Sequence, residues 1–227
     1  MVAVAAIDLA RSERSDLCDL LTETGPDAPT LCEGWTTRDL AAHLVIRESR
    51  PDAALGVLGG PLASWTEKVQ NDAASQDYGK LVTLVRNGPP AWSYFRLPWV
   101  DGQFNTVEYY VHHEDVRRAQ PQWTTRDLSP ELQDFLWDRL TNAFAGRGLF
   151  HSVDGGVTLV RTDRPGVSHR AKSGDPEVTI SGTPGELIMI AFGRREADVE
   201  IEGTEEAVAA FAQARLHIDT EDLWPDD

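Results

Sequence analysis

A carboxylate and two imidazoles in this chain stand at spacings that suit a bound metal ion. Glu108 and His112 are four residues apart, so on an α-helix their side chains lie one turn apart on the same face. Asp115 comes three residues later and continues that face. A second imidazole, that of His43, lies upstream on another predicted helix. One carboxylate and two imidazoles can hold a divalent ion on three sides and leave a fourth coordination position open for chemistry.

The same spacing also has simpler explanations. A Glu and a His four residues apart form ordinary pairs on exposed helix surfaces, worth roughly 0.2–0.5 kcal/mol. However, Val107, Val111 and Val116 indicate that this helix packs inside a bundle, where an unpaired carboxylate would be costly. Helical bundles build their metal sites from side chains that converge in this way. The spacing and its apolar surroundings together favour a metal site over a surface pair.

Four neighbouring features each allow two interpretations. His113 points about 100° away from His112 on a helix, so it is either a structural residue or, if the register is shifted by one, the ligand in its place. Cys32 is either a buried inert thiol or a thiol near the metal. Trp35 either packs beneath the helix that follows it or contacts substrate. The aromatic loop from Trp92 to Trp99 either lines a pocket or plugs the end of the bundle.

The charge of the chain argues against two classes of partner. The 227 residues carry a formal net charge of -16, so the surface repels the phosphates of nucleic acids and anionic membranes. No apolar run approaches the ~18 residues that a membrane-spanning helix needs, and the N-terminus lacks the basic region of a signal peptide. The two cysteines, Cys18 and Cys32, are too few for a disulfide framework. We therefore expect a cytoplasmic protein that binds neither nucleic acid nor membrane.

Helical periodicity fills the first two thirds of the chain, and strand-like alternation appears after it. The change of pattern falls between Gly146 and Gly156. Helices followed by mixed strands and helices indicate two units rather than one layered sheet. We therefore predict an α+β protein, with an antiparallel four-helix bundle over residues 1–146 and a small α+β domain over residues 147–227; the apolar stripes leave the oligomeric state open. The predicted helices are 7–24, 36–50, 61–74, 77–86, 104–119, 129–145, 187–192 and 204–216, and the predicted strands are 157–161, 177–181 and 198–202.

Two segments of the chain carry recognisable motifs. The stretch from Cys32 to Leu44 contains a Gly-Trp pair and then the pattern Asp-Leu-x-x-His-Leu, which ends in the His43-Leu44 pair. The stretch from Thr106 to Asp115 contains a Glu and a His four apart with an Asp three beyond. Both resemble motifs of the mycothiol-dependent maleylpyruvate isomerase family, within the DinB-like superfamily of metal-binding proteins. The segment from Val178 to Gly203 is similar to the small second domain of that family, and the resemblance is closest to an actinobacterial subgroup described only as metal-binding proteins.

The resemblance implies roles for specific residues. It places His43, Glu108 and His112 at the three metal-ligand positions. It places Asp115 where a carboxylate can orient one of the ligands. The chain also departs from the family, because the isomerases tend to carry an Arg three residues before the Glu and this chain has Asn105. Metal binding is unaffected by that difference, but we expect the substrate to differ from that of the isomerases.

The expected function follows from this ligand set and from the family. The resemblance implies a metal-dependent enzyme that activates a low-molecular-weight thiol, mycothiol in the isomerases, for addition to an electrophilic small molecule. Isomerisation or S-transfer would complete the reaction. Zinc is the expected ion, although nickel and iron accept the same ligands. Arg194 is a candidate for binding an anionic substrate group, or else forms an ordinary salt bridge. The alternative is a non-catalytic metal-binding or small-molecule-sensing module on the same fold.

Overall fold

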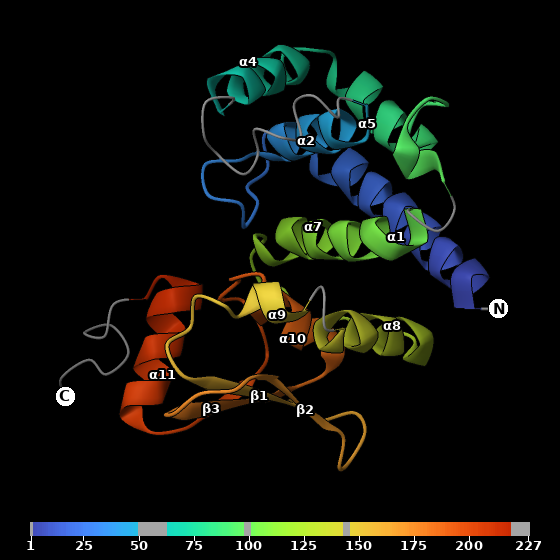
Figure 1. Ribbon diagram of the computed structural model, residues 1–227. Helices are drawn as coiled ribbons and strands as arrows, with labels where there is room; N and C mark the ends of the chain where they lie inside the picture. The colour runs from blue at the N-terminus through green and yellow to red at the C-terminus, as the bar shows by residue number, and fades with distance from the viewer. Residues whose placement is uncertain (1, 50–62, 98–100, 143–145, 219–227) are drawn as a thin grey trace. The chain divides into compact units, whose positions relative to one another are not determined.

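The computed structural model describes residues 2–49, 63–97, 101–142 and 146–218, and the chain divides into two units, Met1–Thr124 and Thr125–Asp227 (Figure 1). The first unit is built from helices. Within the described residues, the second unit carries a four-stranded sheet together with helices. This combination confirms the predicted α+β class. Each unit has its own core, so each is described by itself.

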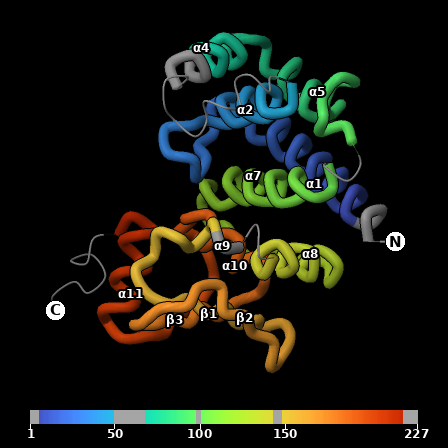
Figure 2. The backbone as a smooth tube through the Cα atoms, viewed as in Figure 1, coloured from blue at the N-terminus to red at the C-terminus, as the bar shows by residue number. Residues whose placement is uncertain are grey.

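Helices form a bundle in the N-terminal unit (Figures 1 and 2). Helix α7 packs along α1, and α2 packs against α4 and α5. The long helices overlap the predicted ones, but α1 begins at Val2, ahead of the predicted residue 7, and the short η1 lies in the predicted aromatic loop. The predicted start at Pro61 and the aromatic residue Trp99 lie outside the described residues. None of the helices in the described ranges is long and apolar enough to cross a membrane. The elements are α1 (Val2–Thr24), α2 (Thr37–Ser49), α4 (Ala63–Ala74), α5 (Tyr78–Asn87), η1 (Tyr94–Arg96), η2 (Asp101–Asn105) and α7 (Thr106–Arg118).

A capping interaction fixes the start of α2. The backbone N–H and the hydroxyl of Thr36 donate hydrogen bonds to Oδ2 of Asp39, at 2.9 and 2.7 Å. A side chain in the first turn that reaches back in this way satisfies a backbone N–H that has no partner within the helix. The carboxylate also lies at the positive end of the helix dipole, which stabilises its charge. The cap therefore determines where His43 lies, one turn further along α2.

Apolar side chains from α1, α2, α5 and α7 form the core of this unit. Leu17 and Leu21 recur at helical spacing on α1, and Tyr109 brings α7 into the same cluster. Removing each large apolar side chain from water contributes roughly 1.5–3 kcal/mol, so packing holds these helices more than helix propensity does. The core members with no exposed surface are Leu17, Cys18, Leu21, Leu40, Ala41, Ala42, Leu81, Tyr109 and Val116.

The turn before α7 lies directly against α1. Asp101–Asn105 forms a π-helical turn, so α7 begins at Thr106 rather than at Phe104, where the periodicity puts it. Gly102 makes the close approach possible, because a Cβ at this position would lie 3.0 Å from the Cβ of Ala6. The Thr106 hydroxyl, as a donor, lies 3.1 Å from the carbonyl oxygen of Ala6. This contact sets the position of α7 relative to α1.

The C-terminal unit places helices on one face of a mixed sheet (Figure 1). The strand order is β2-β1-β3-β4, with β1 and β3 parallel and the outer pairs antiparallel. On β1, Val157 and Leu159 are buried, whereas Thr158 and Val160 are only partly buried, as expected for a sheet covered on one side. The elements are α8 (Pro130–Thr141), α9 (Gly146–Leu149), β1 (Gly156–Arg161), β2 (Ser168–Lys172), β3 (Glu177–Gly182), α10 (Pro184–Ala191), β4 (Glu200–Glu202), α11 (Glu205–Phe211) and η3 (Ala212–Leu216).

Two features of this unit differ from the pattern expected from sequence. Strand β2 has no predicted counterpart, because it is a polar strand at the sheet edge without apolar alternation. Helix α8 packs on α10 and β2, so the compact unit begins at Thr125, ahead of the domain boundary predicted near residue 146. The described part of α8 ends at Thr141, and the predicted end near Ala145 lies outside the described residues. As a division of the sequence into domains, the boundary at 146 stays a prediction.

We predict that Gly102→Ala lowers the free energy of unfolding by about 1–3 kcal/mol, because the added methyl overlaps α1 and forces the two helices apart. Chemical denaturation of the purified variant measures this change. Gly148→Ala is the control, since nothing lies within 4 Å of a Cβ at Gly148. A Gly102→Ala variant as stable as the parent protein would contradict the close packing of η2 on α1.

Candidate metal centre

Helices α2 and α7 bring the three predicted ligands together. Nε2 of His43 and Nε2 of His112 each lie 3.4 Å from Oε1 of Glu108. The two imidazole rings meet edge to face, with 5.4 Å between their centroids. One possible ligand atom from each of the three side chains lies within 4.8 Å of the other two. His43, Glu108 and His112 therefore form a cluster that can hold a metal ion.

The spacing of these atoms fits a tetrahedral ion. An ion bound at ~2.1 Å to nitrogen and oxygen separates neighbouring tetrahedral ligands by about 3.4 Å. This is the distance from Glu108 Oε1 to Nε2 of each imidazole. Two imidazole nitrogens and one carboxylate oxygen are also the donor types of zinc sites that keep an open position, and nickel or iron accept them. The residues present therefore fit a divalent ion.

Cys32, His112 and Asp115 form a neighbouring group of possible ligand atoms. Oδ2 of Asp115 lies 2.9 Å from Nδ1 of His112 and 3.2 Å from Sγ of Cys32. A zinc ion between a thiolate and a carboxylate would hold sulfur and oxygen about 3.5 Å apart, so the observed distances are those of hydrogen bonds. A proton on Nδ1 that is held by Asp115 leaves Nε2 free to face Glu108. The contact places Asp115 where the motif predicted an orienting carboxylate, and it places the half-buried thiol of Cys32 beside the centre.

The register of α7 turns His112, rather than His113, toward Glu108. Nδ1 of His113 lies 3.3 Å from Oε2 of Glu13 on α1, on a different side of the helix from the ligand cluster. Both imidazoles are buried, so burial alone does not distinguish them. The distinction comes from the helical spacing, because only His112 is one turn from Glu108.

Arg47 is a member of the site that the sequence motifs do not mark. Its Nε lies 3.0 Å from Oε1 of Glu108. Its guanidinium stacks over the ring of Phe95 at 4.5 Å, and its Nη1 donates a hydrogen bond to Oδ1 of Asn105. The sequence feature that could have identified Arg47 is its position four residues after His43, which is one turn further along the same face of α2.

The aromatic residues near the site have different environments. Trp35 packs its ring against that of His43, with 5.1 Å between centroids, and also borders the core. Trp35 is thus in a packing position next to a ligand. In the aromatic loop, Phe95 is buried, whereas Trp92 and Tyr94 are 65% and 48% exposed. The described part of the loop therefore reaches the site through Phe95 and leaves its other rings near solvent.

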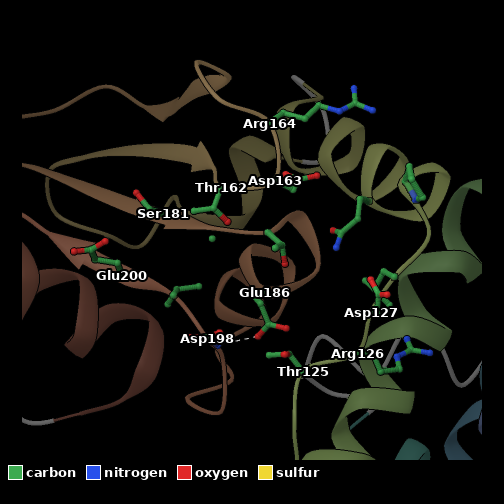
Figure 3. A pocket seen from close by; sticks show the side chains of 16 residues that line it. Thr125, Arg126, Asp127, Thr162, Asp163, Arg164, Ser181, Glu186, Asp198 and Glu200 are labelled. Carbon is green, nitrogen blue, oxygen red and sulfur yellow. Dashed lines mark hydrogen bonds between the residues drawn. The ribbon is translucent and has the colours of Figure 1, made fainter.

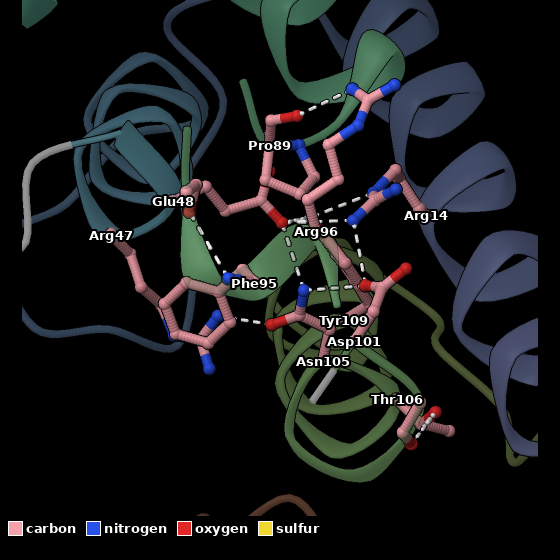
Figure 4. Close-up of polar contacts among 12 residues, drawn as sticks. Arg14, Arg47, Glu48, Pro89, Phe95, Arg96, Asp101, Asn105, Thr106 and Tyr109 are labelled. Carbon is pink, nitrogen blue, oxygen red and sulfur yellow. Dashed lines mark hydrogen bonds and ion pairs between the residues drawn. The ribbon is translucent and has the colours of Figure 1, made fainter. Parts of the chain in front are cut away.

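A buried polar network joins α1, α2 and α7 beside the ligand cluster (Figure 4). Arg14 donates from Nε to the hydroxyl of Tyr109 at 2.9 Å, and from Nη2 to Glu48 at 3.0 Å and to Asp101 at 3.2 Å. Nδ2 of Asn105 donates to the same two carboxylates, at 3.1 and 2.7 Å. All five side chains belong to buried residues. The network thus links three helices through charge-assisted hydrogen bonds.

The charged groups around the centre have an excess of negative charge. At the ligand cluster itself, Arg47 pairs with Glu108 and Asp115 lies beside His112, so with neutral imidazoles the formal balance is one negative charge. Either a proton on an imidazole or a bound cation can compensate this charge, so the balance is compatible with a bound ion.

The two imidazoles have pKa shifts in opposite directions. Burial lowers the pKa of His43 below its ordinary value of 6.5. Burial acts the same way on His112, but its hydrogen bonds to Asp115, Cys32 and Glu108 raise its pKa well above 6.5. Burial opposes the charge of Glu108, yet hydrogen bonds from both imidazoles and the nearby guanidinium hold its pKa well below the usual value. Without an ion, His43 is therefore neutral at pH 7 and His112 carries the proton.

Arg194, the predicted anion-binding residue, lies in the C-terminal unit shortly after α10. Its Nη1 donates a hydrogen bond to the carbonyl oxygen of Phe192 at 2.7 Å. A cavity of about 750 Å³ in the same unit is lined mainly by polar side chains (Figure 3). At its wall, Glu186 accepts a hydrogen bond from the backbone N–H of Asp198 at 2.8 Å. Arg194 is not among the residues that line this cavity, and its role in anion binding stays a prediction.

A family profile and two solved structures of known proteins resemble this chain. The sequence profile of the mycothiol maleylpyruvate isomerase N-terminal domain matches residues 7–144. A crystal structure of the mycothiol-dependent maleylpyruvate isomerase is similar, with a TM-score of 0.63 and 16% identity, over 88% of this chain and 92% of that one. A mutant of that isomerase, with one His replaced by Ala, gives a TM-score of 0.62 and 15% identity over the same shares. No match was found among curated proteins. At these identities the structural likeness shows the fold.

We expect alanine substitution of His43, Glu108 or His112 to release most of the bound metal, because a three-ligand site loses chelation when one ligand is removed. Metal analysis of each purified variant, followed by competition with a chelator, measures the loss. His113→Ala is the matched control and should keep its metal. If His113→Ala loses the metal and His112→Ala does not, the assignment of ligands along α7 is wrong by one residue.

Metal binding at pH 7 should release about one proton per ion, because His112 must give up the proton that its raised pKa retains, while His43 is already neutral. The affinity should therefore fall as the pH falls. Asp115→Asn weakens the hydrogen bond that raises the pKa of His112, so proton release should approach zero. Calorimetry in buffers of different ionisation enthalpy counts the protons. Release of two protons, or unchanged release in Asp115→Asn, would contradict this protonation scheme.

Proposed function

Since the chain belongs to the mycothiol maleylpyruvate isomerase N-terminal domain family, we propose that it is a metal-dependent enzyme of the isomerase or thiol S-transferase type. In this proposal it activates a low-molecular-weight thiol, mycothiol or a close analogue, for addition to an electrophilic small molecule. The observation that carries the proposal is the ligand cluster, in which Nε2 of His43 and of His112 each lie 3.4 Å from Glu108 Oε1.

Three protein ligands leave a coordination position for a small thiol. His43, Glu108 and His112 would hold a divalent ion, zinc in our proposal, and that ion would supply the positive charge that lowers the pKa of a thiol at neutral pH. The protein supplies the ligand positions and a partly buried site. Holding the thiol next to the electrophile then replaces an encounter in solution with a reaction between two bound groups.

The residues around the ligands have separate tasks in this proposal. Asp115 holds the proton on Nδ1 of His112, so that Nε2 presents its lone pair. Arg47, 3.0 Å from Glu108, brings a fixed positive charge to the site. Such a charge favours the anionic form of a thiol and stabilises negative charge that develops on the electrophile during addition. Trp35 packs on His43 and limits the movement of its ring.

Position 105 favours an electrophile other than maleylpyruvate. Family members of the isomerase type tend to carry Arg at this position, whereas the side chain of Asn105 is fully buried and binds Glu48 and Asp101. In this chain the guanidinium beside the ligands comes from Arg47 of α2. We therefore propose weak activity on maleylpyruvate itself, with Arg194 as our candidate for binding an anionic group of the substrate.

The zinc-loaded protein should bind mycothiol and support thiol-dependent turnover of a model electrophile, and a chelator should abolish turnover until zinc is added back. Thiol binding is measured by calorimetry and turnover by loss of the electrophile. The Glu108→Ala variant should do neither, while His113→Ala should retain both. If the zinc-loaded protein binds neither mycothiol nor another small thiol, the enzyme proposal fails and the non-catalytic binding module takes its place.

A further inference from the structure

A cavity of about 420 Å³ lies between the end of α2 and the loop that follows α5. Volumes of roughly 300–1,000 Å³ are usual for small-molecule sites. Val45, Leu84, Pro89 and Pro90 give the cavity mainly apolar walls, and Trp92 also lines it. None of the three metal-ligand candidates lines it, so this cavity is separate from the ligand cluster.

The carboxylate of Glu48 is the polar group that distinguishes this cavity. Glu48 lines it although the residue is only 4% exposed. Its Oε1 accepts hydrogen bonds from Arg14, Asn105 and Tyr109. Within the described residues, its Oε2 accepts none. Glu48 lines the cavity and its Oε2 is not among the fully buried atoms that lack a partner, so this oxygen can accept a hydrogen bond from a ligand there.

The charges near the cavity favour a cation as the ligand. Glu48 and Asp101 share the single guanidinium of Arg14, which leaves one negative charge in excess. Arg47 forms its ion pair with Glu108, although its charge also acts on Glu48. Arg96 also lines the cavity, but it is exposed and its Nη1 donates to the carbonyl oxygen of Pro89. At the cavity wall itself, the carboxylate residue Glu48 is buried, whereas the guanidinium residue Arg96 is exposed.

We propose that this cavity binds a small organic cation, a primary ammonium carried on an apolar body. The ammonium donates to Oε2 of Glu48, and oxygen atoms of Ser49 and Asn87, which also line the cavity, can accept its other N–H groups. The apolar body packs against Leu84 and the ring of Trp92, which is exposed enough to receive it. The inference does not depend on the metal centre.

The probe is 2-phenylethylammonium chloride, titrated calorimetrically into the full-length protein after metal removal, so that the amine cannot coordinate an ion. The expected result is saturable binding of one molecule per chain. The comparison is 3-phenylpropionate, which has the same ring and a similar chain with the opposite charge. It should bind at least about tenfold more weakly, because it would meet Glu48 with a like charge. Equal or tighter binding of 3-phenylpropionate, or no binding of the ammonium, would overturn the proposal.

Variants locate the binding site. Glu48→Gln should weaken ammonium binding by about tenfold or more, since it removes the charge but keeps the shape. Leu84→Trp changes a 39% exposed residue outside the buried network, fills the cavity, and should abolish binding even if Glu48→Gln fails to fold. Tyr94→Ala is the control, because Tyr94 is exposed in the same loop but does not line the cavity. Unchanged binding in Leu84→Trp would refute the assignment to this cavity.

Discussion

The half-buried Glu108 carboxylate between two helices is the constraint on which the N-terminal unit depends. A carboxylate removed from water is tolerated only when it is paired and hydrogen-bonded. A single oxygen of Glu108 is close to Nε2 of His43, Nε2 of His112 and Nε of Arg47. These contacts require α2 and α7 to pack in one register. The cap sets where α2 begins, and the contact of Gly102 with α1 sets the position of the turn before α7.

The polar network beside the ligands extends the same requirement to a third helix. Arg14 of α1 contacts Glu48 of α2 and Tyr109 of α7. Each of these bonds contributes only about 1.5–3 kcal/mol, but a buried charge that loses its partner costs more. A helix shifted by one residue would break several of these bonds together. The network therefore favours the observed packing over packings shifted by one residue. Asn105 connects it to Arg47, and through Arg47 to the ligand cluster.

Local sequence patterns predict the structural features that depend on residues three or four positions apart. The helices and the pairing of Glu108 with His112 belong to this class, whereas His43 was assigned through the motif that precedes it. Arg47 meets Glu108 across two helices, a pairing that local patterns do not show. The sequence does contain a sign that Arg14 is paired, because a charged residue on the apolar face of α1 needs a buried partner. Strand β2 lacks an apolar pattern, and α8 joins the sheet through tertiary packing, so neither outcome could be derived from local sequence.

Arg47 also affects whether the fold of the bundle needs the proposed metal ion. Small zinc domains unfold without their ion, because nothing else holds the ligands together. Here a guanidinium 3.0 Å from Glu108 neutralises the carboxylate from within the chain, and an apolar core holds the helices independently of the ligands. If the proposed ion binds here, its exchange would therefore be uncoupled from folding. The metal in such a site would then be selected by the concentrations available in the cell and by ligand preference, and the fold would not constrain that choice.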